Sequence, residues 1–152
     1  MPFPPADDRI GIPALMRAAR GSYAQAIRAH LAAEGIDDIP RNGAFVLSGL
    51  ANGDESVVDM IRGLGVTKQA VSQLIDTLVL RGYLTRDVNP ADRRRMTIEL
   101  TDRGRAAAAA IGSGVESIDT ELARMISPAQ RAGLRAGLFA LADIKATMKE
   151  VT

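Results

Sequence analysis

Residues 66–86 of the chain read VTKQAVSQLIDTLVLRGYLTR. Thr67 can cap a helix by accepting hydrogen bonds from first-turn amides, and Gly65 permits a sharp approach of the chain before it. Apolar side chains then recur at intervals of three and four residues, as in a helix that buries one face. They are Val71, Leu74, Ile75, Leu78 and Val79. The stretch therefore predicts an amphipathic helix that begins near Thr67.

The opposite face of this helix is polar. It carries Lys68, Gln69, Ser72, Gln73 and Asp76. Apart from Asp76, these side chains are of the kinds that reach phosphates or hydrogen-bond to base edges in a major groove. An ordinary solvated helix face is the alternative interpretation.

An extended hairpin is predicted directly after the helix. Gly82 can end the helix by adopting a left-handed backbone, and the residues from Tyr83 to Thr85 favour a strand. Residues 89–92, Asn-Pro-Ala-Asp, are typical of a turn. In residues 96–100, apolar and polar side chains alternate, as in a half-buried return strand.

Three arginines lie beside the tip of that hairpin: Arg93, Arg94 and Arg95. A guanidinium group is permanently charged and weakly hydrated, so it suits phosphates and a narrow minor groove. A solubilising turn is the alternative. Because the arginine-bearing hairpin adjoins a polar helix face of compatible chemistry, the order of elements favours a winged helix-turn-helix that binds duplex DNA.

The segment from about Ser56 to Gly104 resembles the multiple-antibiotic-resistance regulator (MarR) family. The resemblance is carried by Arg86, Pro90, Asp92, Arg94, Leu100, Thr101 and Gly104. It implies a homodimeric winged-helix transcription factor whose recognition helix begins at Thr67. It also implies that Arg94 lies at or near the tip of the hairpin, where Asp92 orients it.

The remaining sequence predicts further helices, so the expected fold class is mainly α with a small antiparallel β wing. Helices are expected over about residues 10–35, 41–50 and 56–62, the last capped by Ser56. Thr101 can cap a long helix, and Pro128 suits the first turn of another. We expect one domain over residues 1–152, with a winged helix-turn-helix lobe at about 41–100 and dimerisation helices at about 10–35 and 101–150.

Both expected C-terminal helices carry apolar stripes spaced as in a helix-on-helix seam. The stripes are Ile111, Val115, Ile118, Leu122 and Met125, then Leu134, Leu138, Leu141, Ile144 and Met148. We expect them to meet the same stripes of a second copy, and packing within one chain is the alternative. A homodimer would place two recognition helices on successive major grooves of a pseudo-palindromic operator.

Charge is unevenly distributed along the chain, although the formal net charge is only +1. Nine basic and five acidic side chains give residues 62–105 a net charge of +4, and the remaining ten basic and thirteen acidic side chains give −3. Affinity for a polyanion depends on such local charge, because each cation near a phosphate displaces counterions.

Several function classes are disfavoured by composition. The chain has no cysteine, which excludes disulfides, thiolate metal sites and thiol-based sensing, and a single histidine, His30, on the apolar stripe of the first helix. We therefore expect no enzyme, no metal and no cofactor. The N-terminal residues show no signal peptide and no segment is long enough to span a membrane, so we expect a cytoplasmic protein.

The family resemblance also implies a small-molecule pocket between the dimer helices and the DNA-binding lobe. Tyr23, His30 and Phe45 are the candidates for binding a small aromatic effector, with core packing as the alternative for each. The predicted function is a sequence-specific regulator of transcription that binds double-stranded DNA, a homodimeric repressor relieved by such a ligand. A winged-helix module that binds proteins and never touches DNA is the alternative.

Overall fold

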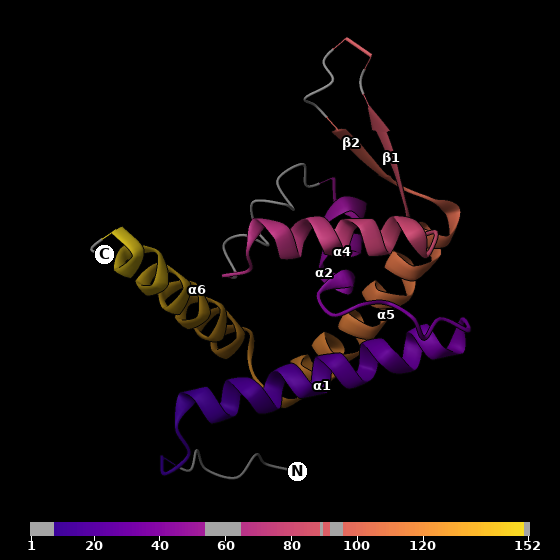
Figure 1. Cartoon of the computed structure of the whole chain (residues 1–152). Coiled ribbons are helices and arrows are strands. Elements are labelled where there is room, and N and C mark those ends of the chain that lie inside the picture. Colours follow the sequence, from indigo (N-terminus) through magenta and orange to yellow (C-terminus); the bar gives the residue numbers. More distant parts are fainter. Residues whose placement is uncertain (1–7, 54–64, 89, 92–95, 151–152) are drawn as a thin grey trace.

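The computed structural model describes residues 8–53, 65–88, 90–91 and 96–150 (Figure 1). The elements are α1 (Ile12–Ala33), α2 (Gly43–Ala51), α4 (Lys68–Leu80), β1 (Leu84–Val88), β2 (Met96–Leu100), α5 (Asp102–Met125) and α6 (Pro128–Glu150). The predicted fold class, mainly α with a small antiparallel hairpin, is confirmed. The helix expected over residues 56–62 lies outside the described residues.

Helix α4 forms as its sequence predicts. The Thr67 side chain accepts a hydrogen bond of 3.1 Å from the Ala70 amide, which satisfies one donor of the first turn. At the other end, Gly82 has a φ of +81° and the Tyr83 amide donates to the Leu78 carbonyl at 2.9 Å. The apolar face from Val71 to Leu78 is buried, so the polar face is left towards solvent.

The strands β1 and β2 pair antiparallel, with Leu84 opposite Leu100 and Val88 opposite Met96. The return strand has the predicted bounds. Figure 1 shows this hairpin, hereafter the wing, projecting away from the helices. Its two strands place residues 90–91 at the far end of the projection, while Leu84 is buried at the base.

The hydrophobic core lies between α2, α4, the base of the wing and the first half of α5. Its most completely buried side chains are Tyr83, Leu47, Leu78, Leu84, Ile111 and Val46. Small residues let α5 approach its neighbours closely. At Gly114, a Cβ atom would lie 2.8 Å from the Cα atom of Ile27, so α1 and α5 cross there in backbone contact.

One expectation needs correction. The apolar stripe of α5 is expected to meet a second copy, but its first member, Ile111, is only 2% exposed and belongs to the core of its own chain. The reason is that the lobe leaves an apolar surface which α5 and α1 close together. Beyond Gly114 the side chains of the helix are more exposed to solvent, and Met125 is exposed.

Helix α6 starts at Pro128 as predicted, and its large apolar side chains are exposed. Its exposed side chains are Leu134, Leu138, Phe139, Leu141, Ile144 and Met148. The start of α1 is similar, with Ile10, Ile12, Leu15 and Met16 exposed. In Figure 1, α6 stands apart from the bundle formed by the other helices.

Candidate nucleic-acid interface

The polar face of α4 is the first component of the candidate site. Lys68, Gln69, Ser72 and Gln73 are all exposed on it. Thr67 is exposed too, but its side-chain oxygen already accepts the capping hydrogen bond from Ala70. The helix therefore presents one cation and several neutral hydrogen-bonding side chains on a single rigid surface, held in place by the buried apolar face behind it.

The one acidic residue of this face is neutralised by the wing. The Nη2 atom of Arg86, in β1, lies 2.6 Å from the Oδ1 atom of Asp76, and these side chains are 28% and 57% exposed. The ion pair neutralises a charge that would repel phosphate, and it connects the wing to α4. Sequence reasoning missed this pair, although the two residues are one acid and one base on consecutive elements.

Contacts at the base of the wing require a threonine at position 101 and a glycine at position 104, at the start of α5. The Thr101 side chain accepts from the Gly104 amide at 3.0 Å and donates to the Gly82 carbonyl at 2.5 Å. A Cβ atom at Gly104 would lie 2.1 Å from the Tyr83 carbonyl oxygen, so no side chain fits. These contacts fix the angle at which α5 leaves the hairpin.

The residues predicted at the tip of the wing, Asp92 and Arg93 to Arg95, lie outside the described residues. Their assignment as DNA-binding and orienting residues stays a prediction. The structure describes the two strands that lead to these tip residues, and the turn at Pro90 and Ala91.

The three candidate ligand residues lie at separate places. The Tyr23 hydroxyl donates to Asp119 of α5, and this hydrogen bond raises the pKa of Tyr23 to about 12. The half-buried His30 donates from Nδ1 to the Ala26 carbonyl at 2.9 Å, and Phe45 is 39% exposed on α2. Tyr23 and His30 are about 10 Å apart along α1, from the rise of 1.5 Å per residue.

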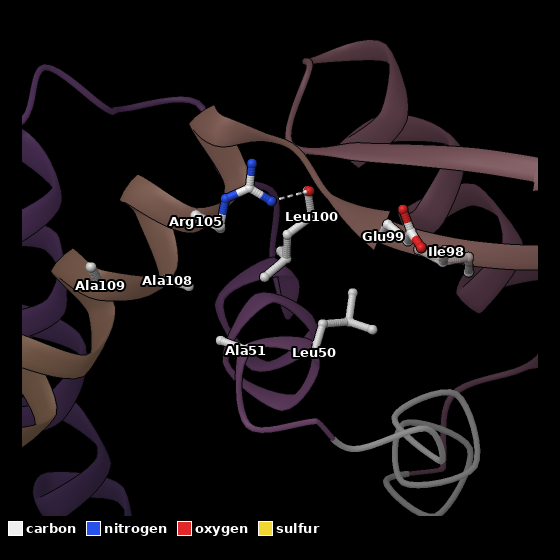
Figure 2. A pocket seen from close by; sticks show the side chains of 8 residues that line it. All are labelled: Leu50, Ala51, Ile98, Glu99, Leu100, Arg105, Ala108 and Ala109. Carbon is white, nitrogen blue, oxygen red and sulfur yellow. Dashed lines mark hydrogen bonds between the residues drawn. The ribbon is translucent and has the colours of Figure 1, made fainter.

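A separate hollow of about 540 Å³ lies between α2, β2 and α5 (Figure 2). It is lined by Leu50, Ala51, Ile98, Glu99, Leu100, Arg105, Ala108 and Ala109. The Arg105 guanidinium at its rim donates to the Leu100 carbonyl at 2.8 Å and pairs with Asp102. None of the three candidate ligand residues is among those that line it.

Residues 37–95 match the MarR family. This segment runs from the residues before α2 into the wing, so it covers α4 and β1. No curated protein matches the chain. Within the part of the chain that the structure describes, no helix is long and apolar enough to cross a membrane.

Solved structures with the same fold cover most of the chain. MepR of S. aureus, solved with DNA, has a TM-score of 0.70 at 21% identity over 88% of this chain and 98% of its own. The transcriptional repressor CouR, bound to a 23-mer DNA duplex, has a TM-score of 0.65 at 21% identity over 87% and 92%. BpsR of Bordetella bronchiseptica, whose DNA binding is regulated by 6-hydroxynicotinic acid, has a TM-score of 0.63 at 22% identity over 91% and 98%.

Proposed function

We propose that this chain, whose winged-helix segment belongs to the MarR family, is a homodimeric repressor of transcription that binds double-stranded DNA through α4 and the wing. The observation that carries the proposal is the exposed polar face of α4 beside the wing, with Asp76 of that face paired to Arg86. This arrangement offers base-reading side chains and a second point of contact to one duplex.

Within this proposal the roles divide by position. Lys68, at the start of α4, binds phosphate, because the positive end of the helix dipole and the free amides of the first turn also favour an anion there. Gln69, Ser72 and Gln73 hydrogen-bond to base edges. Thr67 positions the helix and can donate its hydroxyl proton to a phosphate while its oxygen caps α4. Arg93, Arg94 and Arg95 reach the backbone or the minor groove, with Asp92 orienting Arg94.

A homodimer is supported by the exposed apolar side chains of α6 and of the first turns of α1. Monomeric proteins rarely leave such a surface in water. A second copy that covers it would relate the two α4 helices by a two-fold axis, and the operator would then be pseudo-palindromic.

Regulation by a small aromatic molecule is supported by relatives of the same fold, since BpsR responds to 6-hydroxynicotinic acid and MepR has been solved with ethidium. In this chain Tyr23, His30 and Phe45 are the proposed ligand-binding residues. The dimer would have two states, one whose spacing of recognition helices fits the operator and one whose spacing does not. A ligand that binds the second state more tightly would weaken DNA binding by the difference between its two affinities.

The experiment is a fluorescence-anisotropy titration of the full chain with the promoter duplex that flanks its own gene, at several salt concentrations. We expect affinity to fall with salt, and Lys68→Ala to reduce the slope of log affinity against log salt by about 1, because one phosphate contact is lost. We also expect Arg94→Glu to abolish binding.

Arg28→Ala is the matched control, because it removes the same charge from an exposed position of α1. Its salt slope should equal that of the unmodified protein. Absence of salt-dependent binding in the unmodified chain would contradict the proposed function, and tight binding by Arg94→Glu would contradict the role of the wing tip.

A further inference from the structure

Asp38 bonds to side chains from the end of α4, from the residue before β1 and from the first turn of α5. Asp38 lies in the segment between α1 and α2 and accepts hydrogen bonds from the Tyr83 hydroxyl and from Arg103. The Arg103 Nη2 atom is 3.1 Å and 3.2 Å from the two carboxylate oxygens. Arg81 adds a hydrogen bond from Nη1 to the Asp38 backbone carbonyl. We call these four residues the Asp38 cluster.

The cluster is held rigidly on one side. The Tyr83 residue is 0% exposed, and the Arg103 guanidinium carbon lies 4.6 Å from the centre of its ring. The same Nη2 atom donates to the Tyr83 hydroxyl at 2.9 Å. Hydrogen bonding from Tyr83 holds the pKa of Asp38 below its ordinary value, and burial raises the pKa of Tyr83. At neutral pH the carboxylate is charged and the phenol keeps its proton.

The members of the cluster lie where α4, α5, the wing and the segment after α1 meet. Asp38 follows α1, which packs along α5, and Arg103 lies in the first turn of α5. Arg81 is the C-cap residue of α4, and Tyr83 precedes β1. Asp38 thus connects three places: its carboxylate bonds to Arg103 of α5 and to Tyr83 before the wing, and its backbone carbonyl accepts from Arg81 at the end of α4. None of these side chains is assigned to DNA.

We propose that Asp38, Tyr83 and Arg103 are positioning residues that fix the orientation of α4 relative to α1 and α5, and so set the separation of the two recognition helices in the dimer. The inference rests on the proposed function, because it concerns a dimer that binds two half-sites. Neutralising Asp38 removes the charged acceptor that Arg103 and Tyr83 share. This weakens the connection between α5 and the segment that joins α4 to the wing.

Distances between the two recognition helices test the inference directly. The chain has no cysteine, so Leu80→Cys, at the 87% exposed last residue of α4, gives one spin label per protomer. Pulsed dipolar spectroscopy on the free dimer should give one narrow distance distribution for the labelled parent. Asp38→Asn, Tyr83→Phe and Arg103→Lys should each broaden it, since each alters the cluster with little change in volume.

Asp37→Asn is the matched control, because it neutralises the neighbouring carboxylate, for which the described residues offer no hydrogen-bond partner or ion pair. It should leave the distribution narrow. Equal, narrow distributions for the parent and all three cluster variants would overturn the inference.

A second readout separates positioning from simple stabilisation. The unmodified protein selects a duplex from a random pool, and affinities are measured for that duplex and for one with a base pair inserted between the half-sites. The parent should discriminate strongly between them, and Asp38→Asn should reduce the ratio of the two affinities towards one. A purely stabilising residue would lower both affinities alike and leave the ratio unchanged, which would overturn the inference.

The two proposals fail differently in these experiments. A parent that selects no duplex contradicts DNA binding itself, and a labelled parent without dipolar modulation contradicts the dimer and the inference with it. A parent that dimerises and discriminates while the cluster variants behave identically contradicts the positioning role alone.

Discussion

Tyr23 and Tyr83 show how single residues join distant parts of this chain. Each is a phenol that donates to a carboxylate, Tyr23 to Asp119 across α1 and α5, and Tyr83 to Asp38 across the lobe. In both cases the protonated phenol makes the hydrogen bond, because an ionised phenolate could not donate and would repel the carboxylate. Both bonds therefore persist at neutral pH and are sensitive to strongly alkaline pH.

This predicts an unusual alkaline titration. The pKa of Tyr23 is raised from 10.0 to about 12, first by its hydrogen bond to Asp119, and the pKa of Tyr83 is also raised. The unfolded chain ionises at the lower pH, so the stabilisation by Tyr23 is complete below pH 10.0 and is lost as the pH rises through about 12. The chain has two tyrosines and no tryptophan, so phenolate absorbance measures them without interference.

The expected result is less phenolate in the folded protein at pH 10 than in urea, where both tyrosines titrate near that pH. Asp119→Asn should lower the pKa of Tyr23 and leave that of Tyr83 unchanged. Full-amplitude titration of the folded protein near pH 10 would show that the Tyr23 hydrogen bond does not form in solution.

Among the elements, α5 has two halves that pack differently. From Gly104 to Gly114 it consists mostly of glycine, alanine and serine and packs on the lobe and on α1, while beyond Gly114 its side chains are half-buried or exposed. Small side chains allow backbone approach that larger ones would prevent. The first half thereby fixes the lobe to α1, and the second half carries the chain on to α6.

Two glycines in the first half of α5 make a matched test of its close packing. Gly104→Ala should destabilise the protein by more than the about 1–3 kcal/mol of ordinary overpacking, because its Cβ atom would lie 2.1 Å from the Tyr83 carbonyl oxygen. Gly112 meets no atom within 4 Å, so Gly112→Ala should stabilise the helix by about 1 kcal/mol through its propensity alone.

Urea denaturation followed by circular dichroism, at one fixed protein concentration, measures both free energies of unfolding. If the two variants proved equally stable, the close crossing of α5 over the base of the wing would be contradicted.

On the scale of the whole molecule, the apolar surfaces divide into one that is covered and one that is not. The lobe core is closed by α1 and α5, whereas α6 and the start of α1 expose large aliphatic side chains and Phe139. Exposure of so much apolar surface indicates an interface with a second molecule. The proposed dimer would convert this surface into the frame that holds two recognition helices apart.

A charge on the α6 stripe should therefore separate the protomers. Leu138 is 44% exposed, and Leu138→Glu would place a carboxylate at the proposed interface, where its desolvation is unfavourable. We expect sedimentation equilibrium to show a monomer. We also expect the affinity of this variant for the operator to fall, because a monomer offers only one recognition helix. Ala136→Glu, an exposed position on the opposite side of α6, should leave both unchanged.

A dimer that survives Leu138→Glu at low micromolar concentration would place the interface elsewhere. Monomeric Leu138→Glu that still binds the full operator with unchanged affinity would contradict the requirement for two recognition helices.

The sequence by itself determined the local architecture. The caps at Thr67 and Thr101, the end of α4 at Gly82 and the alternation in β2 all depend on interactions within a few residues, so spacing and residue type suffice to predict them. The polar face of α4 follows from the same periodicity, and so its exposure was predictable.

Only the tertiary structure decided which faces meet. Asp38 bonds to residues 45 and 65 positions away, and Tyr23 to one 96 positions away, separations at which no periodic pattern identifies a partner. The same holds for the first half of α5, whose stripe fits a second helix equally well within the chain or beyond it. Its neighbours α1 and α2 assign it to the core, and Gly114 admits the backbone of α1 closely.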